Sequence, residues 1–339
     1  MTVLLRGWGE PRFRGEQLWQ GLYRQLAAGP EEMTTLPRHL RQRLVEEADW
    51  SPLEALRDES TDDGLTNKTL FRSADGQTFE TVLMRYPDRN TVCASSQVGC
   101  AIGCPFCATG QAGWVRYLST AEITAQILAA ARRLAHEGRP LTNVVFMGMG
   151  EPLLNYEAVW GAIRNLNDER GLGLGMRRFT ISTAGIVPGI ERLTAEGTGV
   201  GLAISLHAAD NALRDRLVPI NRRYPLEGLL EAVARYAEHS GRRPTYEYAL
   251  IDGVNDSDAH AQRLVERLRG TLCHVNLIPL NATGDAALRP SPAARVQRFR
   301  AILQRGAIEA TVRVSRGAEI RAGCGQLRGR AAAPQNGER

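Results

Sequence analysis

The sequence predicts an α/β fold in three parts: a small helical N-terminal unit, a short β region, and a partial barrel of (β/α)6 type. Beyond about residue 91, apolar strand patterns alternate with helical patterns, which indicates a parallel sheet with crossover helices. Residues 1–48 carry helical periodicity alone, whereas residues 49–85 show short strands separated by turns. Six or seven strand–helix units suit an open or partial barrel better than a closed eight-fold one.

The N-terminal unit is expected to contain two helices. Leu18, Leu22 and Leu26 repeat every four residues and give the first helix one apolar face. Leucines at the same interval mark a second helix over residues 37–47, which also carries several arginines. Those arginines form either a solvated helix face or a contact surface for RNA.

The β region connects this unit to the barrel. We expect short strands over residues 69–72 and 79–84, because apolar and β-branched residues gather there. Asp-Gly pairs at residues 63–64 and 75–76 mark the turns between them.

The barrel is expected to span residues 86–328, with a disordered tail over residues 329–339. A capping box from Ser119 to Glu122 begins one of its helices, which ends near Gly138. The expected strands cover residues 91–96, 143–147, 178–183, 199–206, 245–251, 274–280 and 310–314.

Composition favours a globular protein without membrane segments. The chain has 339 residues, of which 43% are hydrophobic and 23% are charged, so it can bury a large core and is not a disordered chain. No apolar run approaches the ~18 residues of a membrane span, and the first residues become charged too early for a signal peptide. We therefore expect a cytoplasmic protein with no membrane partner.

The basic residues are of one kind. There are 42 of them against 37 acidic residues, and Lys68 is the only lysine. Arginine presents a planar fork to phosphates and stacks on bases, which would suit an RNA partner. A GC-rich genome that favours arginine codons would give the same composition, so the net charge of +5 does not identify a partner.

The cysteines give the strongest chemical signal. Cys100, Cys104 and Cys107 form a C-x3-C-x2-C loop directly after the first predicted barrel strand. Three thiolates on one loop can hold three irons of a [4Fe–4S] cluster and leave the fourth iron free to bind a substrate or cofactor. A structural zinc site is the alternative, but zinc prefers four ligands and no fourth ligand stands nearby.

Small polar groups follow several predicted strands. In such barrels the chemistry gathers at the carboxyl ends of the strands, so these groups are expected to share one rim. Each of them alone would be an ordinary structural residue. The set comprises Gly150 and Glu151 after the second strand, Ser182 at the third, Ser205 and His207 at the fourth, and Asn281 after the sixth.

The remaining cysteines lie outside the loop. Cys324 lies in a glycine-flanked stretch, where an exposed thiol in a mobile loop would suit nucleophilic work and an inert small hydrophobe is the alternative. Cys93 taken alone is typical of a buried strand residue, and Cys273 is assigned a structural role.

These motifs together resemble two nested families. The C-x3-C-x2-C loop, with an aromatic residue before its last cysteine and a partial barrel behind it, is similar to that of radical S-adenosylmethionine (SAM) enzymes. Within that group the chain resembles the RlmN/Cfr family of RNA adenosine methyltransferases, and the RlmN branch in particular. The resemblance spans nearly the whole chain and rests on residues 13–18, 93–110, 148–152, 205–207, 276–281 and 322–327.

The resemblance assigns roles to single residues. It implies that the loop cysteines hold a [4Fe–4S] cluster and that Cys324 carries a methyl group. It makes Cys93 the partner that closes a transient disulfide with Cys324. Glu80, which from the sequence alone is an ordinary edge-strand glutamate, becomes the general base that accepts the ring proton. The residues expected to line the SAM site are Gly150, Glu151, Ser182, Ser205, Leu206, His207 and Asn281.

The resemblance also implies the reaction. Two molecules of SAM are used per turnover: one methylates Cys324, and the other is cleaved at the cluster to a 5′-deoxyadenosyl radical. The activated methyl group on Cys324 then adds to C2 of adenine, Glu80 removes the ring proton, and Cys93 releases the product.

The implied partners are RNA and an electron donor. The expected targets are an adenosine at the peptidyl-transferase centre of 23S rRNA and the adenosine just 3′ of the anticodon in tRNAs. A flavodoxin- or ferredoxin-type protein would supply electrons to a monomeric enzyme. Two alternatives stay open: Cfr-type methylation at C8 of the same rRNA base, and a non-catalytic iron–sulfur or zinc RNA-binding module.

Overall fold

The computed structural model describes residues 2–50, 52–283, 288–313 and 316–329. Of the predicted tail it describes only Gly329, whose amide donates to Glu80, and residues 330–339 lie outside the described part. Within these ranges no helix is both long and apolar enough to cross a membrane. The α-helices are α1 (Thr2–Gly7), α2 (Arg12–Tyr23), α3 (Arg38–Glu47), α4 (Ala108–Gln111), α5 (Thr120–His136), α6 (Tyr156–Asn167), α7 (Val187–Ala195), α8 (Asn211–Leu217), α9 (Leu226–Ser240), α10 (Asp258–Leu268) and α11 (Ala293–Arg305). Short 3-10 helices are η1 (Pro30–Glu32), η2 (Pro152–Asn155), η3 (Met176–Arg178) and η4 (Pro219–Arg222).

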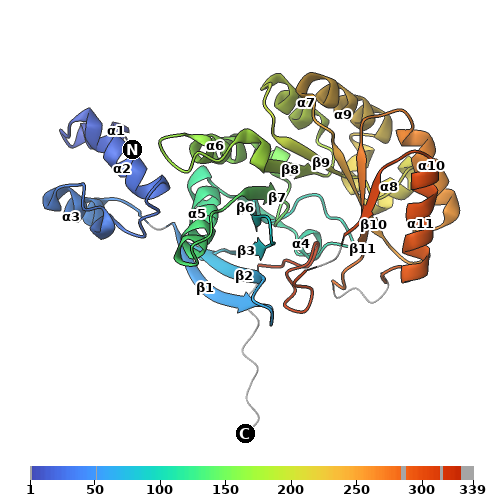
Figure 1. Cartoon of the computed structure of the whole chain (residues 1–339), viewed down its shortest axis with the longest axis horizontal. Coiled ribbons are helices and arrows are strands. Elements are labelled where there is room, and N and C mark those ends of the chain that lie inside the picture. The colour runs from blue at the N-terminus through green and yellow to red at the C-terminus, as the bar shows by residue number, and fades with distance from the viewer. Residues whose placement is uncertain (1, 51, 284–287, 314–315, 330–339) are drawn as a thin grey trace, which may run out of the picture.

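A ten-stranded sheet forms the centre of the molecule, in the order β1-β2-β3-β4-β7-β8-β9-β10-β11-β12. From β4 to β12 all neighbouring strands are parallel, and the larger helices pass between them on the outer face, which confirms the predicted partial barrel (Figure 1). The last predicted strand ends at Val312, and residue 314 lies outside the described part of the chain. The strands of this sheet are β1 (Leu53–Ser60), β2 (Thr66–Ser73), β3 (Thr78–Arg85), β4 (Asn90–Cys93), β7 (Asn143–Phe146), β8 (Phe179–Thr183), β9 (Gly201–Ser205), β10 (Thr245–Leu250), β11 (His274–Pro279) and β12 (Ala310–Val312).

The β region continues the barrel sheet. Strands β1, β2 and β3 are antiparallel, and β3 pairs with β4 so that Val82 lies opposite Cys93. The sequence analysis missed β1, whose side chains are mostly exposed and charged and therefore lack an apolar pattern. This pairing brings the strand of Glu80 beside the strand that ends at Cys93.

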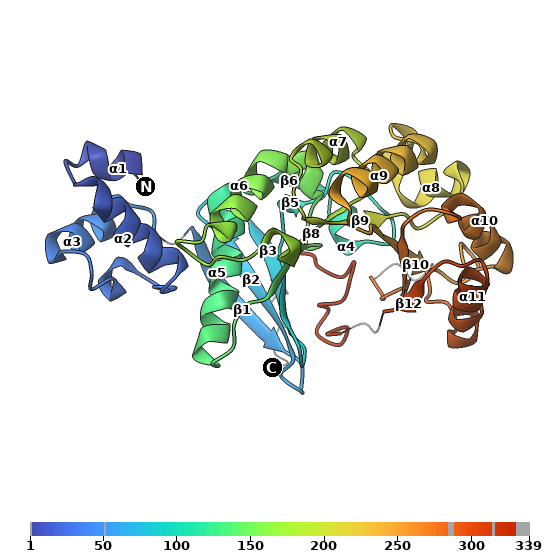
Figure 2. The ribbon, with the colours of Figure 1, turned by 45° about the horizontal axis from the view of Figure 1, so that its top comes forward.

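The helical N-terminal unit has a small core of its own. Helices α1 to α3 stand at one end of the molecule (Figure 2). The expected repeat through Leu26 is wrong in part, because α2 ends at Tyr23 and Leu26 has a φ of 58°. The core of this unit consists of Leu5, Leu18, Ala27, Met33, Leu36, Leu40 and Leu44.

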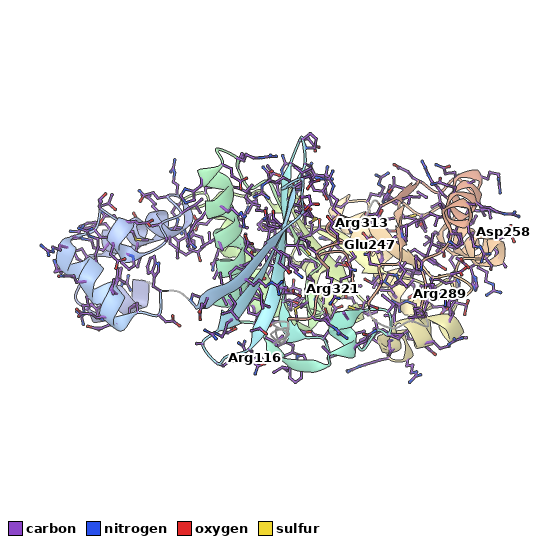
Figure 3. All side chains as sticks on the ribbon, turned by 90° about the horizontal axis from the view of Figure 1, so that it is seen from below. Arg116, Glu247, Asp258, Arg289, Arg313 and Arg321 are labelled. Carbon is purple, nitrogen blue, oxygen red and sulfur yellow. The ribbon has the colours of Figure 1, made fainter. Side chains whose placement is uncertain are left out.

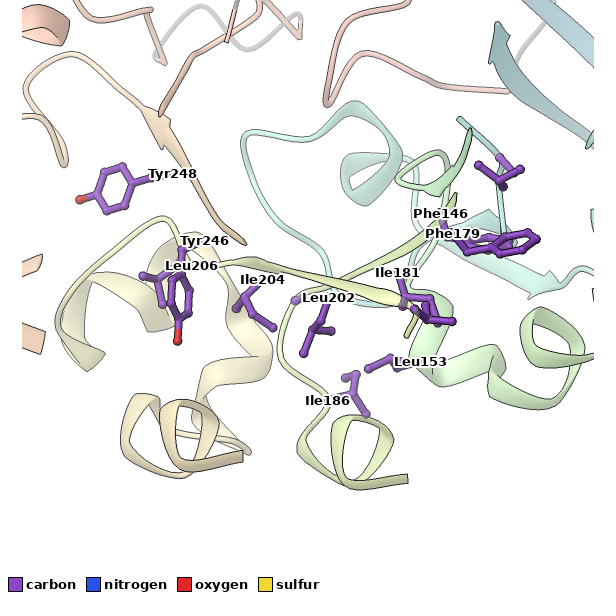
Figure 4. Packing of buried hydrophobic residues seen from close by; sticks show 14 of the residues in the cluster. Phe146, Leu153, Phe179, Ile181, Ile186, Leu202, Ile204, Leu206, Tyr246 and Tyr248 are labelled. Atoms are coloured by element: carbon purple, nitrogen blue, oxygen red, sulfur yellow. The ribbon is translucent and has the colours of Figure 1, made fainter. Parts of the chain in front are cut away.

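The barrel is packed between its strands and helices. Phe146, Phe179 and Ile181 on the strands lie near Leu153 and Ile186, which begin the segments that cross back over the sheet (Figure 4). The predicted capping box holds α5: the Ser119 hydroxyl accepts from the Glu122 amide, and the Glu122 carboxylate accepts from the Ser119 amide. A filled interior leaves the carboxyl ends of the strands as the place for a binding site.

Candidate active site

One cavity lies at the carboxyl ends of the parallel strands. It gathers side chains from β4, the cysteine loop, the ends of β7 to β9, and the segments after β11 and β12. Of the residues predicted for the site, Glu80 and Leu206 are not part of its lining. The predicted residues that line it are Cys93, Cys100, Cys104, Cys107, Gly150, Glu151, Ser182, Ser205, His207, Asn281 and Cys324.

An antiparallel ribbon of β5 (Gln97–Gly99) and β6 (Trp114–Tyr117) supports the cysteine loop. The sequence analysis did not predict this ribbon, and it separates the loop from the end of β4. At Gly99 φ is 75°, and an added Cβ would lie 1.9 Å from the carbonyl oxygen of Gly113. Only glycine fits this crossing of two backbones. The ribbon therefore fixes the position where the loop begins and ends.

The three cysteines of the loop are free, partly buried thiols. Burial raises the pKa of Cys100 to about 12 and raises that of Cys104 well above its usual range, and neighbouring loop thiols raise both further. Such thiols stay protonated at neutral pH unless a cationic group takes the place of the proton. Metal coordination does this, because the thiolate is the form that binds a metal.

The arrangement fits a cluster better than a single ion. Within the described ranges, no three His, Cys, Asp or Glu side chains are arranged to hold one metal ion. In a [4Fe–4S] cluster each thiolate binds a different iron, so the ligands stand further apart than those of one zinc ion. Three cysteines on one loop, with Cys93 and Cys324 on other segments of the same cavity, suit a cluster with an open iron.

Glu151 is a buried carboxylate at the end of β7. Its oxygens accept hydrogen bonds from the amides of Leu153 (3.0 Å) and Ala184 (2.7 Å), so it braces two loops of the rim. Burial raises its pKa to about 7, and those two amides oppose the shift. Gly150 before it has a φ of 103°, and an added Cβ would lie 2.8 Å from the amide nitrogen of Gln97. A close, buried carboxylate of this kind favours a cationic ligand group.

His207 lies in the left-handed region with a φ of 58°. Its Nδ1 accepts a hydrogen bond from the amide of Ala249 at 2.9 Å, which places the ring proton on Nε2. Burial lowers its pKa to about 3, so the ring is neutral. The edge of this ring meets Phe106, the aromatic residue of the cysteine loop, at 4.8 Å between centroids. His207 therefore positions the loop and does not exchange protons near neutral pH.

Arg214 links two backbone segments at the rim of the cavity by hydrogen bonds. Its guanidinium donates to the carbonyl oxygens of Ala184 (2.6 Å), Ser205 (3.1 Å) and Leu206 (3.1 Å). Burial lowers its pKa to about 10, and the neighbouring Cys104 opposes that shift. Leu206 is buried and contributes its backbone to this network, whereas Ser182 is partly exposed on the cavity wall.

Cys93 and Cys324 meet in the cavity although 231 positions separate them in the sequence. The expectation of an exposed thiol at Cys324 is wrong, because this residue is partly buried. Burial raises the pKa of the Cys324 thiol, and the charge of Arg313 opposes the shift. Burial also raises the pKa of Cys93 to about 12, and the charge of a Cys324 thiolate raises it further. Arg313 lies beside Glu247 in the same cavity (Figure 3). The side-chain amide of Asn281 donates to the Cys324 carbonyl oxygen at 3.0 Å, so Asn281 holds the segment of Cys324.

Glu80 lies beside the cavity under the end of the chain. It shares a face of β3 with Val82, which lines the cavity, because alternate residues of a strand point to the same side. Its Oε1 pairs with Lys68 at 3.2 Å. Its Oε2 accepts the backbone amides of Arg328 (2.7 Å) and Gly329 (3.2 Å). The segment that follows Cys324 therefore covers this carboxylate.

Two positioning residues escaped the sequence analysis. Arg214 is one of 41 arginines and carries no local motif, so nothing in the sequence distinguishes it. Asn255 donates from Nδ2 to the carbonyl oxygens of His207 (2.9 Å) and Ala249 (2.6 Å), which fixes the left-handed turn at His207. One sequence feature could have indicated the surroundings of Glu80: Lys68, which contacts it, is the only lysine of the chain.

Two family models match separate parts of the chain. The model of the radical SAM superfamily matches residues 95–265, and that of the ribosomal RNA large subunit methyltransferase N-terminal domain matches residues 1–49. The first match covers the cysteine loop and the barrel strands β7 to β10, and the second covers the helical N-terminal unit.

Relatives match over nearly the full chain. A protein of Moorella thermoacetica named probable dual-specificity RNA methyltransferase RlmN is 51% identical over 94% of this chain and 92% of its own length. One of the same name from Frankia casuarinae is 52% identical over 94% of this chain and 78% of its own. The crystal structure of a radical SAM methyltransferase from Sphaerobacter thermophilus has a TM-score of 0.95 and 54% identity, covering 97% of this chain and 96% of that one. The chain therefore belongs to the RlmN family of radical SAM RNA methyltransferases.

Proposed function

We propose that the protein methylates C2 of one adenosine at the peptidyl-transferase centre of 23S rRNA and of the adenosine 3′ of the anticodon in tRNAs. The observation that carries the proposal is the cavity itself. Three loop cysteines, the buried carboxylate of Glu151 and the separate pair of Cys93 and Cys324 all line it. A binding module without catalysis would leave that second pair without a role.

The cofactors of this family are a [4Fe–4S] cluster and SAM. When bound at Cys100, Cys104 and Cys107, the cluster supplies the electron that cleaves SAM to a radical. We assign the ammonium group of SAM to Glu151 and the exposed backbone at Gly150, with Ser182, Ser205 and His207 on the adjoining walls. Leu206 contributes through its backbone, and Asn281 through the carrier segment.

The proposed work of the chain is divided among three residues. Cys324 carries the methyl group and becomes bonded through its carbon to C2 of adenine. Glu80 takes the proton that leaves the ring carbon, and the unpaired electron left by the radical addition would return to the cluster. Cys93 then attacks the sulfur of Cys324: the S–S bond forms as the C–S bond breaks, and the carbon keeps the electron pair and takes up a proton to become the methyl group.

We further propose the context in which the enzyme works. Residues 1–48 serve as an RNA-binding unit, residues 49–85 connect it to the barrel, and residues 86–328 hold the chemistry. The match of residues 1–49 to the family's N-terminal domain supports the first boundary. A flavodoxin- or ferredoxin-type donor supplies electrons, and the protein acts as a monomer in the cytoplasm, where ribosomes and tRNAs are found.

Mass spectrometry of nucleosides tests the function. The enzyme with its cluster reconstituted under anaerobic conditions is incubated with SAM, a reductant and unmodified rRNA or tRNA. We expect 2-methyladenosine in both RNAs and 5′-deoxyadenosine as coproduct. Finding 8-methyladenosine would identify the Cfr-type reaction instead. An iron–sulfur spectrum without 5′-deoxyadenosine would favour the binding module.

A further inference from the structure

Lys68 is the residue from which a further inference starts. It is the only lysine among 42 basic residues, so arginine occupies every other basic position of the chain. Its side chain is therefore the only lysine ammonium group of the chain. The structure places that amine against Glu80, the base of the proposed function.

Three charged side chains form a row across β1, β2 and β3. The Nζ of Lys68 lies 2.8 Å from Oε2 of Glu59 on one side and 3.2 Å from Oε1 of Glu80 on the other. The register explains the row: Glu59 is directly opposite Lys68, and Glu80 is diagonal to it, two residues before its direct partner Val82. All three therefore project from one face of the antiparallel sheet.

The row leads from the cavity side of the sheet toward solvent. The side chains of Lys68 and Glu80 are each 9% exposed, whereas that of Glu59 is 27% exposed. At its outer end Glu59 also meets Arg57, which is 54% exposed, at 2.8 Å. A proton that reaches Glu59 can thus pass to water, whereas Glu80 is covered as long as it accepts the amides of Arg328 and Gly329.

The two oxygens of Glu80 face different partners. Oε1 is held by Lys68, and Oε2 accepts the backbone amides of Arg328 and Gly329. Once the two hydrogen bonds from Arg328 and Gly329 break, Oε2 is the oxygen left free to take a proton. Lys68 holds the carboxylate in its orientation meanwhile, because the two opposite charges are in contact.

An amine and a guanidinium differ in what they can do in this place. The lysine ammonium carries three donors and can release a proton, whereas the arginine guanidinium stays protonated in proteins. Both would neutralise the charge of Glu80, but only the amine can give one proton to Glu59 and take another from Glu80. The retained lysine therefore points to proton movement as well as charge.

We propose that Lys68 positions Glu80 and relays its proton to Glu59. The inference rests on the proposed function, in which Glu80 takes the proton from the adenine ring. Lys68 gives an N–H proton to the Glu59 carboxylate and takes the proton bound to Glu80 in its place. Lys68 ends as the ammonium it was, Glu80 is again a carboxylate, and Glu59 passes the proton to water.

The test compares Lys68→Arg with wild type in the full-length holoenzyme. A single-turnover reaction with labelled tRNA, sampled on denaturing gels between pH 6 and 9, measures how fast the protein–RNA adduct forms and how fast it resolves. We expect SAM cleavage and adduct formation as in wild type, with resolution at neutral pH slowed on the order of tenfold to a hundredfold. The slow step should recover toward pH 9, where hydroxide can take the proton from Glu80.

Two further variants locate the effect. Arg57→Lys makes the reverse exchange of cation one step further out, in contact with the same Glu59, and should resolve the adduct at the wild-type rate. Glu59→Gln removes the proton acceptor from a strand that is mostly exposed, and should slow resolution severalfold without loss of folding. This variant keeps the inference testable if a change at Lys68 prevents folding.

The outcomes separate this inference from the proposed function. Wild-type enzyme that makes neither adduct nor methyladenosine would contradict the proposed function. Wild-type enzyme that does both, together with Lys68→Arg that resolves its adduct at the same rate and with the same pH profile, would show that Lys68 serves only as a counter-ion. Normal resolution by Glu59→Gln would overturn the relay.

Discussion

SAM binding should strengthen as pH rises toward 7, because the proposed ammonium partner is a carboxylate with a raised pKa. Burial raises the pKa of Glu151 to about 7. If only the ionised form binds the ammonium, about 3% of the protein is competent at pH 5.5 and about half at pH 7, so affinity should rise about fifteenfold. The SAM ammonium keeps its proton over this range, since α-amino groups titrate near pH ~8.

Calorimetric titration of the anaerobic holoenzyme with SAM at constant ionic strength measures this slope. Glu151→Gln should bind weakly and equally at both pH values. Glu247→Gln is the matched control, because Glu247 is another buried carboxylate in the same cavity and should leave the slope unchanged. His207 contributes nothing here, since its pKa of about 3 lies below the range. A wild-type SAM affinity that does not change with pH would contradict the assignment of Glu151 to the ammonium site. A pH dependence that persists in Glu151→Gln would contradict it as well.

Three further predictions concern stability and the cysteine pair. Because the folded-state pKa of Glu151 is raised, its contribution to stability is complete below its ordinary value of 4.5 and is lost as pH rises through 7. In SAM-free wild-type protein the unfolding free energy should therefore contain a part that falls between pH 4.5 and 8. Glu151→Gln should remove this part, which is at most about 3 kcal/mol, as urea titrations would show. Arg214→Met removes the donor to three carbonyl oxygens, of which only that of Leu206 keeps another hydrogen bond, from the amide of Ala208. It should lower the unfolding free energy by about 3 kcal/mol, and equal urea midpoints would contradict this. Cys93→Ala should stall as a protein–RNA adduct on a denaturing gel, whereas Cys324→Ala and the double variant should form none; full turnover by Cys93→Ala would refute the pairing.

The barrel was predictable because its signals are local and repeated. Buried parallel strands are apolar runs, and each crossover helix keeps one apolar face, so the period of the sequence changes at every boundary. Strand β1 and the ribbon of β5 and β6 gave no such signal. Strand β1 is charged and exposed, and the ribbon strands are three and four residues long, which is too short for a period to appear.

The lining of the cavity was predictable where a residue belongs to a local motif or follows a strand. The loop cysteines and Gly150-Glu151 belong to such motifs, and the structure places them in one cavity with the polar residues that follow other strands. Arg214 and Asn255 act on the carbonyl oxygens of other segments, and backbone acceptors leave no trace in a sequence. The contact that covers Glu80 could not be predicted from the sequence either, because it consists of two backbone amides, those of Arg328 and Gly329.

The segment that carries Cys324 links the proposed steps to one another. Helix α4, which directly follows the cysteine loop, donates to the carbonyl oxygens of Gly325 (2.7 Å) and Leu327 (2.6 Å). The next two residues give their amides to Glu80, so the carrier is tied to the cysteine loop and the base is covered by the same stretch of chain. An RNA base can reach Oε2 of Glu80 only after those last bonds break, whereas the bonds to α4 can remain. We infer that the carrier can stay beside the loop cysteines while the end of the segment opens, which separates loading of Cys324 from proton removal by Glu80.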